Sequence, residues 1–185
     1  MNKYYTTSLL FIGLLSLYCC KKDTIPPITP ITSTGLFSAK VDTTSFSSDP
    51  FSIDSLTGQY LGTYASIVGG TTPQLSVIGQ KNNPNDTSHT SISFFTATVA
   101  LGRYTSALPV SAPGFCDFKY ARGIVGNEVV WHTDGPDSGS VIITKLDTIN
   151  KLVSGTFSFT AFSVSASPAT HVITQGVFTD VSVKP

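Results

Sequence analysis

The chain has 185 residues with 11 basic and 11 acidic side chains, a formal net charge of zero, and only 12% charged residues. It has no basic patch and no stripe of cations interleaved with aromatic residues, which argues against nucleic acids and other polyanions as partners. A length of this order predicts one ordinary domain.

An apolar run near the start of the chain predicts an export signal. Residues 9–18 read LLFIGLLSLY, and they follow the basic Lys3. A transmembrane helix needs roughly 20 apolar residues, whereas a basic start before a short apolar core is typical of a secretory signal peptide. We therefore expect residues 1–19 to be a signal peptide, with a membrane-anchoring helix or an ordinary secreted protein as the alternatives.

Two cysteines at the end of this run favour a lipoprotein. Leu17-Tyr18-Cys19-Cys20 resembles the lipobox of bacterial lipoproteins, in which Leu and a small residue precede the modified cysteine by three positions and one position. With Cys20 as the modified residue, Leu17 and Cys19 take these places. The resemblance implies a diacylglycerol and an amide-linked acyl chain, such as palmitate, on Cys20. More than one acyl chain holds a protein firmly to a membrane.

Residues 20–34 predict a flexible tether that starts at the lipidated cysteine. Pro26, Pro27 and Pro30 lie among threonines and isoleucines, and prolines favour an extended spacer over a helix. Lys21-Lys22-Asp23 resembles the charged tethers of lipoproteins from the Bacteroidetes group. We expect a lipid-anchored outer-membrane protein, and the sequence leaves open whether it faces the periplasm or the cell surface.

Residues 35–185 read as one all-β domain. No window of a dozen residues has a helical apolar face, whereas apolar and hydroxyl residues alternate over short segments separated by Gly-, Pro- and Asn-rich turns. We predict an antiparallel β-sandwich or barrel of about nine to ten strands. The expected strands cover residues 36–41, 60–68, 74–80, 90–99, 115–121, 128–132, 140–146, 153–161 and 172–183.

The clearest local prediction is a β-hairpin over residues 140–161. In its second strand Phe157 and Phe159 share one face, while hydroxyl residues occupy the other, a pattern typical of a half-buried strand. Asp147 suits the corner because aspartate tolerates unusual backbone angles and bonds its neighbours. In the last strand Gly176 interrupts the alternation and predicts a bulge.

Several segments resemble one known family. Phe37-Ser38-Ala39-Lys40-Val41-Asp42 looks like its opening strand, and Gly102-Arg103-Tyr104 looks like its central turn. Its C-terminal signature is similar to three segments of this chain, Gly139–Asp147, Gly155–Phe159 and Ile173–Phe178. The family is a Bacteroidetes group of lipoproteins of unknown function with a DUF6252-like domain. The resemblance covers roughly residues 35–183 and implies an envelope address and an all-β fold, but no activity.

The thiol, imidazole and carboxylate groups predict no cofactor. Cys116 has no disulfide partner once Cys19 leaves with the signal and Cys20 carries the lipid, and we expect it to be buried. The turn from Asp134 to Asp137 offers two carboxylates to calcium, but an ordinary hairpin turn is the preferred interpretation. The histidines lack zinc-type spacing and read as surface or strand-end residues; they are His89, His132 and His171.

No catalytic motif stands out, and no G-x-S-x-G elbow is present. Glu128 is the only glutamate, and a glycosidase would need it to face an aspartate across a cleft. We interpret Glu128 as a solvated strand carboxylate. Five aromatic residues are candidates for stacking on a sugar, although such residues in sandwiches usually form the core; they are Trp131, Tyr60, Tyr64, Tyr104 and Tyr120.

Four short segments resemble the O-glycosylation acceptor of exported Bacteroidetes proteins. In each, Asp precedes a hydroxyl residue that is followed by an aliphatic residue or threonine. The candidate acceptors are Thr24, Thr43, Ser55 and Thr148. Chance matches are also expected in a chain this rich in hydroxyl groups.

Together these features predict a lipid-anchored, non-catalytic binding or structural module of the cell envelope, with a glycan or an envelope protein as its partner. A carbohydrate-binding accessory lipoprotein is the alternative, and a glycan hydrolase is the second alternative. A buried Trp131 and a Glu128 on an open flat face would count against both.

Overall fold

The computed structural model describes residues 35–55, 57–69, 72–133 and 138–184. Within these ranges the regular structure is entirely β, with thirteen strands and no helix, which confirms the predicted all-β class. No helix within these ranges is long and apolar enough to cross a bilayer. The predicted signal peptide, Cys20, the tether and the Asp134–Asp137 turn lie outside the described residues.

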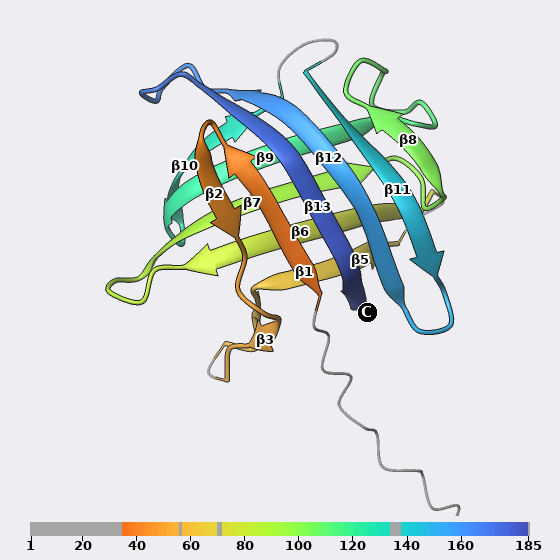
Figure 1. The fold of residues 1–185 in the computed structure, drawn as a ribbon, viewed down its shortest axis with the longest axis horizontal. Helices are drawn as coiled ribbons and strands as arrows, with labels where there is room; N and C mark the ends of the chain where they lie inside the picture. The colour runs from red at the N-terminus through yellow and green to blue at the C-terminus, as the bar shows by residue number, and fades with distance from the viewer. Residues whose placement is uncertain (1–34, 56, 70–71, 134–137, 185) are drawn as a thin grey trace, which may run out of the picture. The chain divides into compact units, whose positions relative to one another are not determined.

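Two layers of strands cross each other (Figure 1). The front layer in this view contains, in spatial order, β2 (Thr44–Ser47), β1 (Leu36–Val41), β13 (Thr170–Lys184), β12 (Leu152–Phe162), β11 (Gly139–Asp147) and β8 (Gly102–Thr105). The back layer contains β5 (Thr63–Val68), β6 (Gln74–Asn82), β7 (Ser88–Thr96), β9 (Cys116–Ile124) and β10 (Asn127–His132). A small separate hairpin pairs β3 (Ser52–Ile53) with β4 (Tyr60–Leu61).

The layers are joined at two corners. At one corner β13 pairs in parallel with β5, where Val183 lies opposite Ala65. At the other, His132 of β10 pairs with Phe162 of β12. Because β12 and β13 also pair with each other, seven strands form a hydrogen-bonded ring. The eleven main strands therefore form one mostly antiparallel sheet that closes on itself as a barrel, with the two layers as its opposite walls.

Phenylalanine side chains from both layers fill the space between them. The ring of Phe94 on β7 lies 5.3 Å from the ring of Phe178 on β13 and 5.8 Å from that of Phe157 on β12, measured between centroids. Phe118 on β9 stacks on Phe159 of β12 at 4.6 Å. On β12 the buried rings occupy alternate positions, and the opposite face of this strand is left to hydroxyl residues.

The predicted hairpin over residues 140–161 is confirmed as β11 and β12, and the predicted bulge lies at Gln175, next to Gly176, where the backbone φ is 52°. The expected strand 60–68 is divided into β4 and β5 at Gly62, where φ is 76°. The segment Gly102–Tyr104, expected as a turn, is part of strand β8. The structure has more strands than the nine or ten that were expected, and most of the additional ones are the short strands β2, β3 and β8.

Candidate binding site

Three of the five aromatic candidates belong to the core. Trp131, Tyr104 and Tyr120 are each no more than 5% exposed. The indole Nε1 of Trp131 donates a hydrogen bond to the carbonyl oxygen of Pro168 at 2.9 Å, and the hydroxyl of Tyr104 donates one to the carbonyl oxygen of Ala100 at 2.8 Å. These rings therefore present no free face on which a sugar could stack.

Tyr60 and Tyr64 lie together on the outer face of the back layer. On β5 the flanking residues Thr63 and Ala65 are fully buried, so Tyr64 points away from the interior. The ring centroids of the two tyrosines are 5.4 Å apart at an interplanar angle of 73°. Both rings are half-buried, and burial, with a smaller effect of Tyr60, raises the pKa of Tyr64. Its hydroxyl therefore stays protonated at neutral pH and can donate a hydrogen bond.

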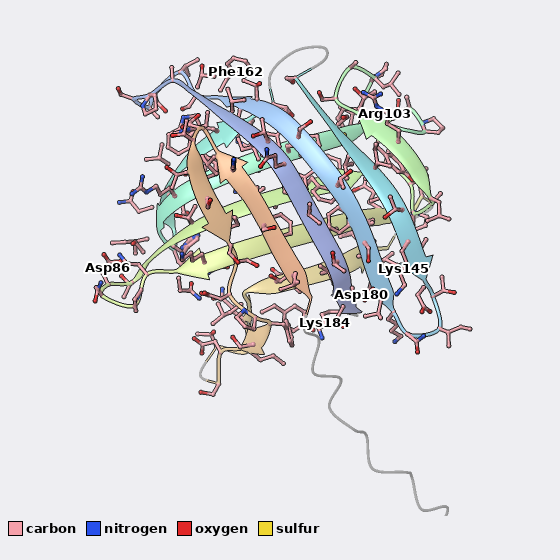
Figure 2. The ribbon with its side chains drawn as sticks, in the orientation of Figure 1. Asp86, Arg103, Lys145, Phe162, Asp180 and Lys184 are labelled. Atoms are coloured by element: carbon pink, nitrogen blue, oxygen red, sulfur yellow. The ribbon has the colours of Figure 1, made fainter. Side chains whose placement is uncertain are left out.

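A third ring and a cation complete this cluster. Phe51 lies 5.7 Å from Tyr60 and 6.4 Å from Tyr64 between ring centroids. Lys184, labelled at the end of β13 in Figure 2, places its Nζ 3.8 Å from the centroid of the Phe51 ring. Burial lowers the pKa of Lys184. Because the ammonium group covers Phe51, the two tyrosines are the rings left to meet a ligand.

A cleft of about 270 Å³ opens beside the two tyrosines, between the β3–β4 hairpin and the β9–β10 turn. Besides these rings, its lining includes two amides, an imidazole and a carboxylate, from Gln59, Gln80, His89 and Glu128. We call this surface the tyrosine cleft. It combines flat apolar rings with donors and acceptors of hydrogen bonds, which is the usual make-up of a small-molecule site.

His89 lines the cleft and has one ring nitrogen without a hydrogen-bond partner in the described residues. Its position on β7 is on the outer face, yet its side chain is only 8% exposed. Nε2 lies 3.7 Å from Oε1 of Glu128, beyond hydrogen-bonding distance. Nδ1 is buried and has no hydrogen-bond partner within the described residues. Buried polar atoms are nearly always paired in folded proteins, so this nitrogen is an exception within the described residues.

Glu128 is ionised at neutral pH. Its own backbone N–H and that of Gly126 hold the pKa of the carboxyl below its usual range, with a smaller effect of His89. The Gly126 N–H donates to Oε2 at 3.1 Å. An ionised carboxylate accepts hydrogen bonds from hydroxyl groups, but it has no proton to donate as a general acid. Glu128 is also the only carboxylate in the lining of this cleft.

The remaining predicted residues are dispersed. Thr43, Ser55 and Thr148 are exposed in turns, where a modifying enzyme could reach them, whereas Thr24 lies outside the described residues. Cys116 is buried, as expected. His132 is exposed, and His171 pairs with Asp42. In the part of the chain that the structure describes, no three His, Cys, Asp or Glu side chains converge as a metal site; the calcium candidates Asp134 and Asp137 fall outside it.

Sequence reasoning missed Gln59, Gln80 and His89 as members of the cleft. The outward position of Gln80 follows from the alternation along β6, where Leu75, Val77 and Gly79 are buried. No sequence signal placed the β3–β4 hairpin beside this face, because its strands have only two residues each. That placement is what brings Gln59 and Tyr60 to the other residues.

A comparison with family models matches residues 62–182 to the domain of unknown function DUF6252. No curated protein and no solved structure matches the chain. The matched segment runs from the start of β5 into β13 and includes Tyr64, Gln80, His89 and Glu128 of the cleft. It covers well over half of the chain and agrees with the resemblance drawn from the C-terminal strands. The chain belongs to the DUF6252 family.

Proposed function

We propose that this protein is a lipid-anchored, non-catalytic binding module of the cell envelope, and that its tyrosine cleft takes a glycan. The observation that carries the proposal is the set of side chains that line the cleft together with Tyr60 and Tyr64. Two half-buried rings stand beside two amides, a carboxylate and an imidazole with an unpaired nitrogen.

These groups match the chemistry of sugars. The C–H face of a pyranose packs on aromatic rings, and its hydroxyl groups exchange hydrogen bonds with amides and carboxylates. Gln59 and Gln80 can both donate and accept, Glu128 accepts, and the Tyr64 hydroxyl donates. At about 270 Å³ the cleft is near the lower limit of ligand pockets, roughly 300 Å³, which suits one sugar unit of a longer chain.

Binding fits this cleft better than hydrolysis does. A glycoside hydrolase of the usual kind needs a protonated acid and a second carboxyl group across the bond. Here a single carboxylate lines the cleft, and backbone hydrogen bonds keep its pKa low. The proposal therefore assigns Glu128 the role of a hydrogen-bond acceptor.

Support for the anchor comes from the start of the chain. The apolar run followed by Cys19-Cys20 and a proline-rich stretch is typical of a lipoprotein, and the domain begins with β1 directly after that stretch. The proposed partners are thus the membrane, through the lipid on Cys20, and a glycan, through the cleft. An envelope protein is the alternative partner.

Glycan binding is tested with the purified full-length chain in detergent, by a thermal-shift screen of neutral and acidic glycans followed by calorimetric titration of each hit. A ligand at a hundred times its Kd stabilises the folded state by about 2.7 kcal/mol. We expect Tyr60→Ala and Tyr64→Ala each to weaken binding by about tenfold, and Tyr64→Phe to weaken it less. Phe162→Ala, which removes an exposed ring on β12 (Figure 2), is the matched control. Binding that survives both alanine substitutions would place the glycan elsewhere.

The anchor is tested in cells that process lipoproteins. The native chain should incorporate an alkyne-labelled palmitate and partition into the detergent phase. Cys20→Ser should lose the label and move to the aqueous phase, while Cys116→Ser keeps both properties. Equal labelling of Cys20→Ser and the native chain would refute the proposed lipidation site.

A further inference from the structure

A second cleft is lined by residues of both layers, beside the turn that joins β1 to β2. Figure 1 shows where this turn lies. It has a volume of about 290 Å³. We call it the mouth cleft and define it by Asp42, Lys81, Thr90, Tyr120, Arg122 and His171, which all line it. These residues come from both layers. Lys81, Thr90 and Arg122 lie on the side of their strands opposite to the one that carries the tyrosine cleft, so the two clefts are distinct.

The back layer contributes a row of side chains that carries two cations. Lys81 on β6 is directly opposite Thr90 on β7, and Thr90 is directly opposite Arg122 on β9. Each of the three is an even number of positions from a buried residue of its strand, such as Val77 on β6 and Tyr120 on β9, so each lies on the same side of the strand as that residue. Because neighbouring strands lie 4.7–4.9 Å apart, the two cations start from backbone positions about 10 Å apart. Both therefore emerge into the same opening.

The front layer contributes Asp42 and His171, which are bonded to each other. His171 Nδ1 lies 2.8 Å from Oδ2 of Asp42, and Oδ1 of Asp42 accepts a hydrogen bond from the N–H of Val172 at 3.0 Å. The backbone bond first, and the bond with His171 second, hold the pKa of Asp42 below its usual range. Both oxygens of this carboxylate already have partners.

The two cations of the row consequently have no carboxylate of their own. Within the described ranges, neither Lys81 nor Arg122 has a carboxylate oxygen within 4.0 Å, the distance of an ion pair. Asp42, the one carboxylate in the lining, is engaged by His171 and Val172. The mouth cleft therefore has an excess of positive charge. It lies beside Asp42 and His171, whose positions are fixed by their hydrogen bonds.

The rings of Phe46, Tyr120 and His171 line this cleft, and Trp131 packs against the last two. The ring of His171 lies 4.9 Å from Tyr120 and 4.8 Å from Trp131, and Tyr120 lies 5.3 Å from Trp131. Phe46 is also buried in the lining. Burial raises the pKa of Tyr120, so its hydroxyl remains a hydrogen-bond donor. Apolar rings beside two cations suit a ligand with an anionic end and a compact body.

We propose that the mouth cleft binds a small organic carboxylate, with Arg122 and Lys81 holding the anionic end at the opening and the buried Tyr120 closing the bottom of the cleft. The planar guanidinium of arginine presents two parallel N–H donors that match the two oxygens of a carboxylate. The ammonium of Lys81 supplies a second charge from the other end of the row. The hydroxyl of Thr90, between them, can bond a polar group on the body of the ligand. A volume of about 290 Å³ limits that body to about one ring.

The chain carries its own reporter for this site. Trp131 is the only tryptophan, and its ring contacts Tyr120 and His171, which both line the mouth cleft. Full-length protein in detergent is titrated with D-glucuronate and with benzoate, with D-glucose and benzamide as their uncharged counterparts. We expect at least one of the acids to change the fluorescence of Trp131 saturably, with heat released in calorimetry, and the uncharged counterparts to have no effect.

Substitutions separate the site from general charge effects. Arg122→Gln should weaken binding of the acid by at least about tenfold, because it removes the bidentate partner. Lys119→Gln removes one positive charge from the same strand on the opposite face, and it should change the Kd by less than about twofold. Tyr64→Ala, in the tyrosine cleft, should also leave the response of Trp131 unchanged. Circular dichroism of each variant checks that the fold is intact.

Four results would overturn the proposal. They are silence with both acids, an equal response to an acid and its uncharged counterpart, equal weakening by Arg122→Gln and Lys119→Gln, or equally tight binding of inorganic phosphate. The last would indicate a general anion site that does not discriminate carboxylates.

Discussion

The side chain of Cys116 is fully buried at the start of β9, and this position controls its chemistry. Burial raises the pKa of the thiol to about 12, and the neighbouring carboxylate of Asp117 adds to the rise, while a hydrogen bond with the backbone of Val141 opposes it. Thiolate is the reactive form of cysteine. At neutral pH Cys116 is therefore a small apolar residue of the core.

We predict that Cys116 does not react with a thiol reagent in the native protein. In a variant with Cys19→Ser and Cys20→Ser it is the only thiol, because the chain has three cysteines. Modification by Ellman's reagent at pH 8 should be slower by at least about a hundredfold in buffer than in guanidinium chloride, where the chain is unfolded. Rapid labelling in buffer, with the circular dichroism unchanged, would contradict the burial of this residue.

Trp131 shows why residue positions were harder to predict than strands. Alternation placed Val129 and Trp131 on one face of β10, yet Val129 is 43% exposed while Trp131 is 5% exposed. The difference arises because the segment before β13 covers Trp131 and accepts its indole hydrogen bond through Pro168. A period of two assigns a face, but it does not say which distant segment covers that face.

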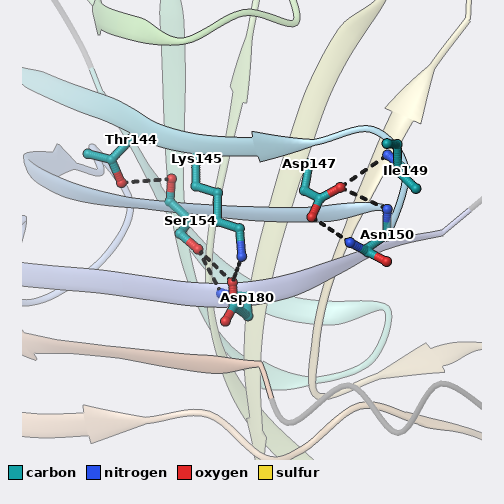
Figure 3. A network of polar contacts seen from close by, with 7 residues as sticks. All are labelled: Thr144, Lys145, Asp147, Ile149, Asn150, Ser154 and Asp180. Carbon is teal, nitrogen blue, oxygen red and sulfur yellow. Dashed lines mark hydrogen bonds and ion pairs between the residues drawn. The ribbon is translucent and has the colours of Figure 1, made fainter.

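At the scale of elements, the β11–β12 hairpin is held by polar contacts at its end and across its outer face (Figure 3). Asp147 accepts hydrogen bonds from the backbone N–H groups of Asn150 at 2.8 Å and Ile149 at 3.1 Å. Across β12, the Nζ of Lys145 donates to Oδ1 of Asp180 at 2.7 Å. These contacts explain why the corner begins at an aspartate, the residue that sequence analysis singled out there.

We predict that the contribution of Asp147 to stability depends on pH. The hydrogen bonds from Asn150 and Ile149, with a smaller effect of Lys145, lower the pKa of its carboxyl. A lowered pKa in the folded state gives stability that is present above the ordinary pKa of aspartate and lost as the pH falls through the folded value. Asp147→Asn should therefore have a lower free energy of unfolding than the native chain at pH 7. The difference should shrink as the pH falls below the ordinary pKa of aspartate and the carboxyl of Asp147 becomes protonated.

The measurement is urea denaturation of both proteins at a series of pH values. Because the other carboxylates titrate in both chains, only the difference between the two curves reports on Asp147. A difference that is constant from pH 7 to pH 2 would show that the charge of this residue does not contribute.

The close contact at Gly155 gives a second prediction for this hairpin. A β-carbon there would lie 2.2 Å from the carbonyl oxygen of Ile142 on β11 and 2.5 Å from the ring of Phe178. Gly155→Ala must therefore push β11 and β12 apart or displace the ring, and overpacking of this kind costs about 3 kcal/mol. Gly69→Ala is the control, because no atom lies within 4 Å of the added carbon. Equal urea midpoints for the two variants would argue against this packing.

Strands with long alternating patterns were predicted well, and short strands were not. β12 has eleven residues with regular alternation of burial, so its pattern alone determines which side chains face the core. β3 and β4 have two residues each, too few for any period. The tyrosine cleft depends on that hairpin, which is why the sequence proposed Tyr60 and Tyr64 but could not place them in a cleft.

The arrangement of the whole domain depends on pairings between distant parts of the chain. β13 pairs with β1, β12 and β5, which lie far from one another in sequence. Local patterns indicated an all-β sandwich or barrel, but they contain no information on which strands meet at the corners. The mouth cleft is a product of such pairings, because Lys81, Thr90 and Arg122 come together only through the register of β6, β7 and β9.

We predict that the two layers unfold together. β13 is hydrogen-bonded to strands of both layers, and Phe178 on this strand packs against Phe94 of the back layer. Loss of either layer would expose the core of the other, so partly folded forms should be scarce. In urea, the fluorescence of Trp131 on β10 and the circular dichroism of all strands should follow one curve. Phe178→Ala, at a fully buried position, should shift both signals equally and lower the free energy of unfolding by about 4 kcal/mol.

Val177→Ala provides the internal control for that shift, because Val177 is the neighbouring residue on the outer face of β13 and is 41% exposed. Its substitution should change stability by no more than about 1 kcal/mol. If Phe178→Ala moved the circular dichroism midpoint but left that of Trp131 in place, the back layer would be stable without the front one. The hydrogen bonds between β13 and β5 and between β10 and β12 would then be too weak to couple the unfolding of the two layers. Coincident curves would instead show that the continuous core outweighs the few hydrogen bonds at those corners.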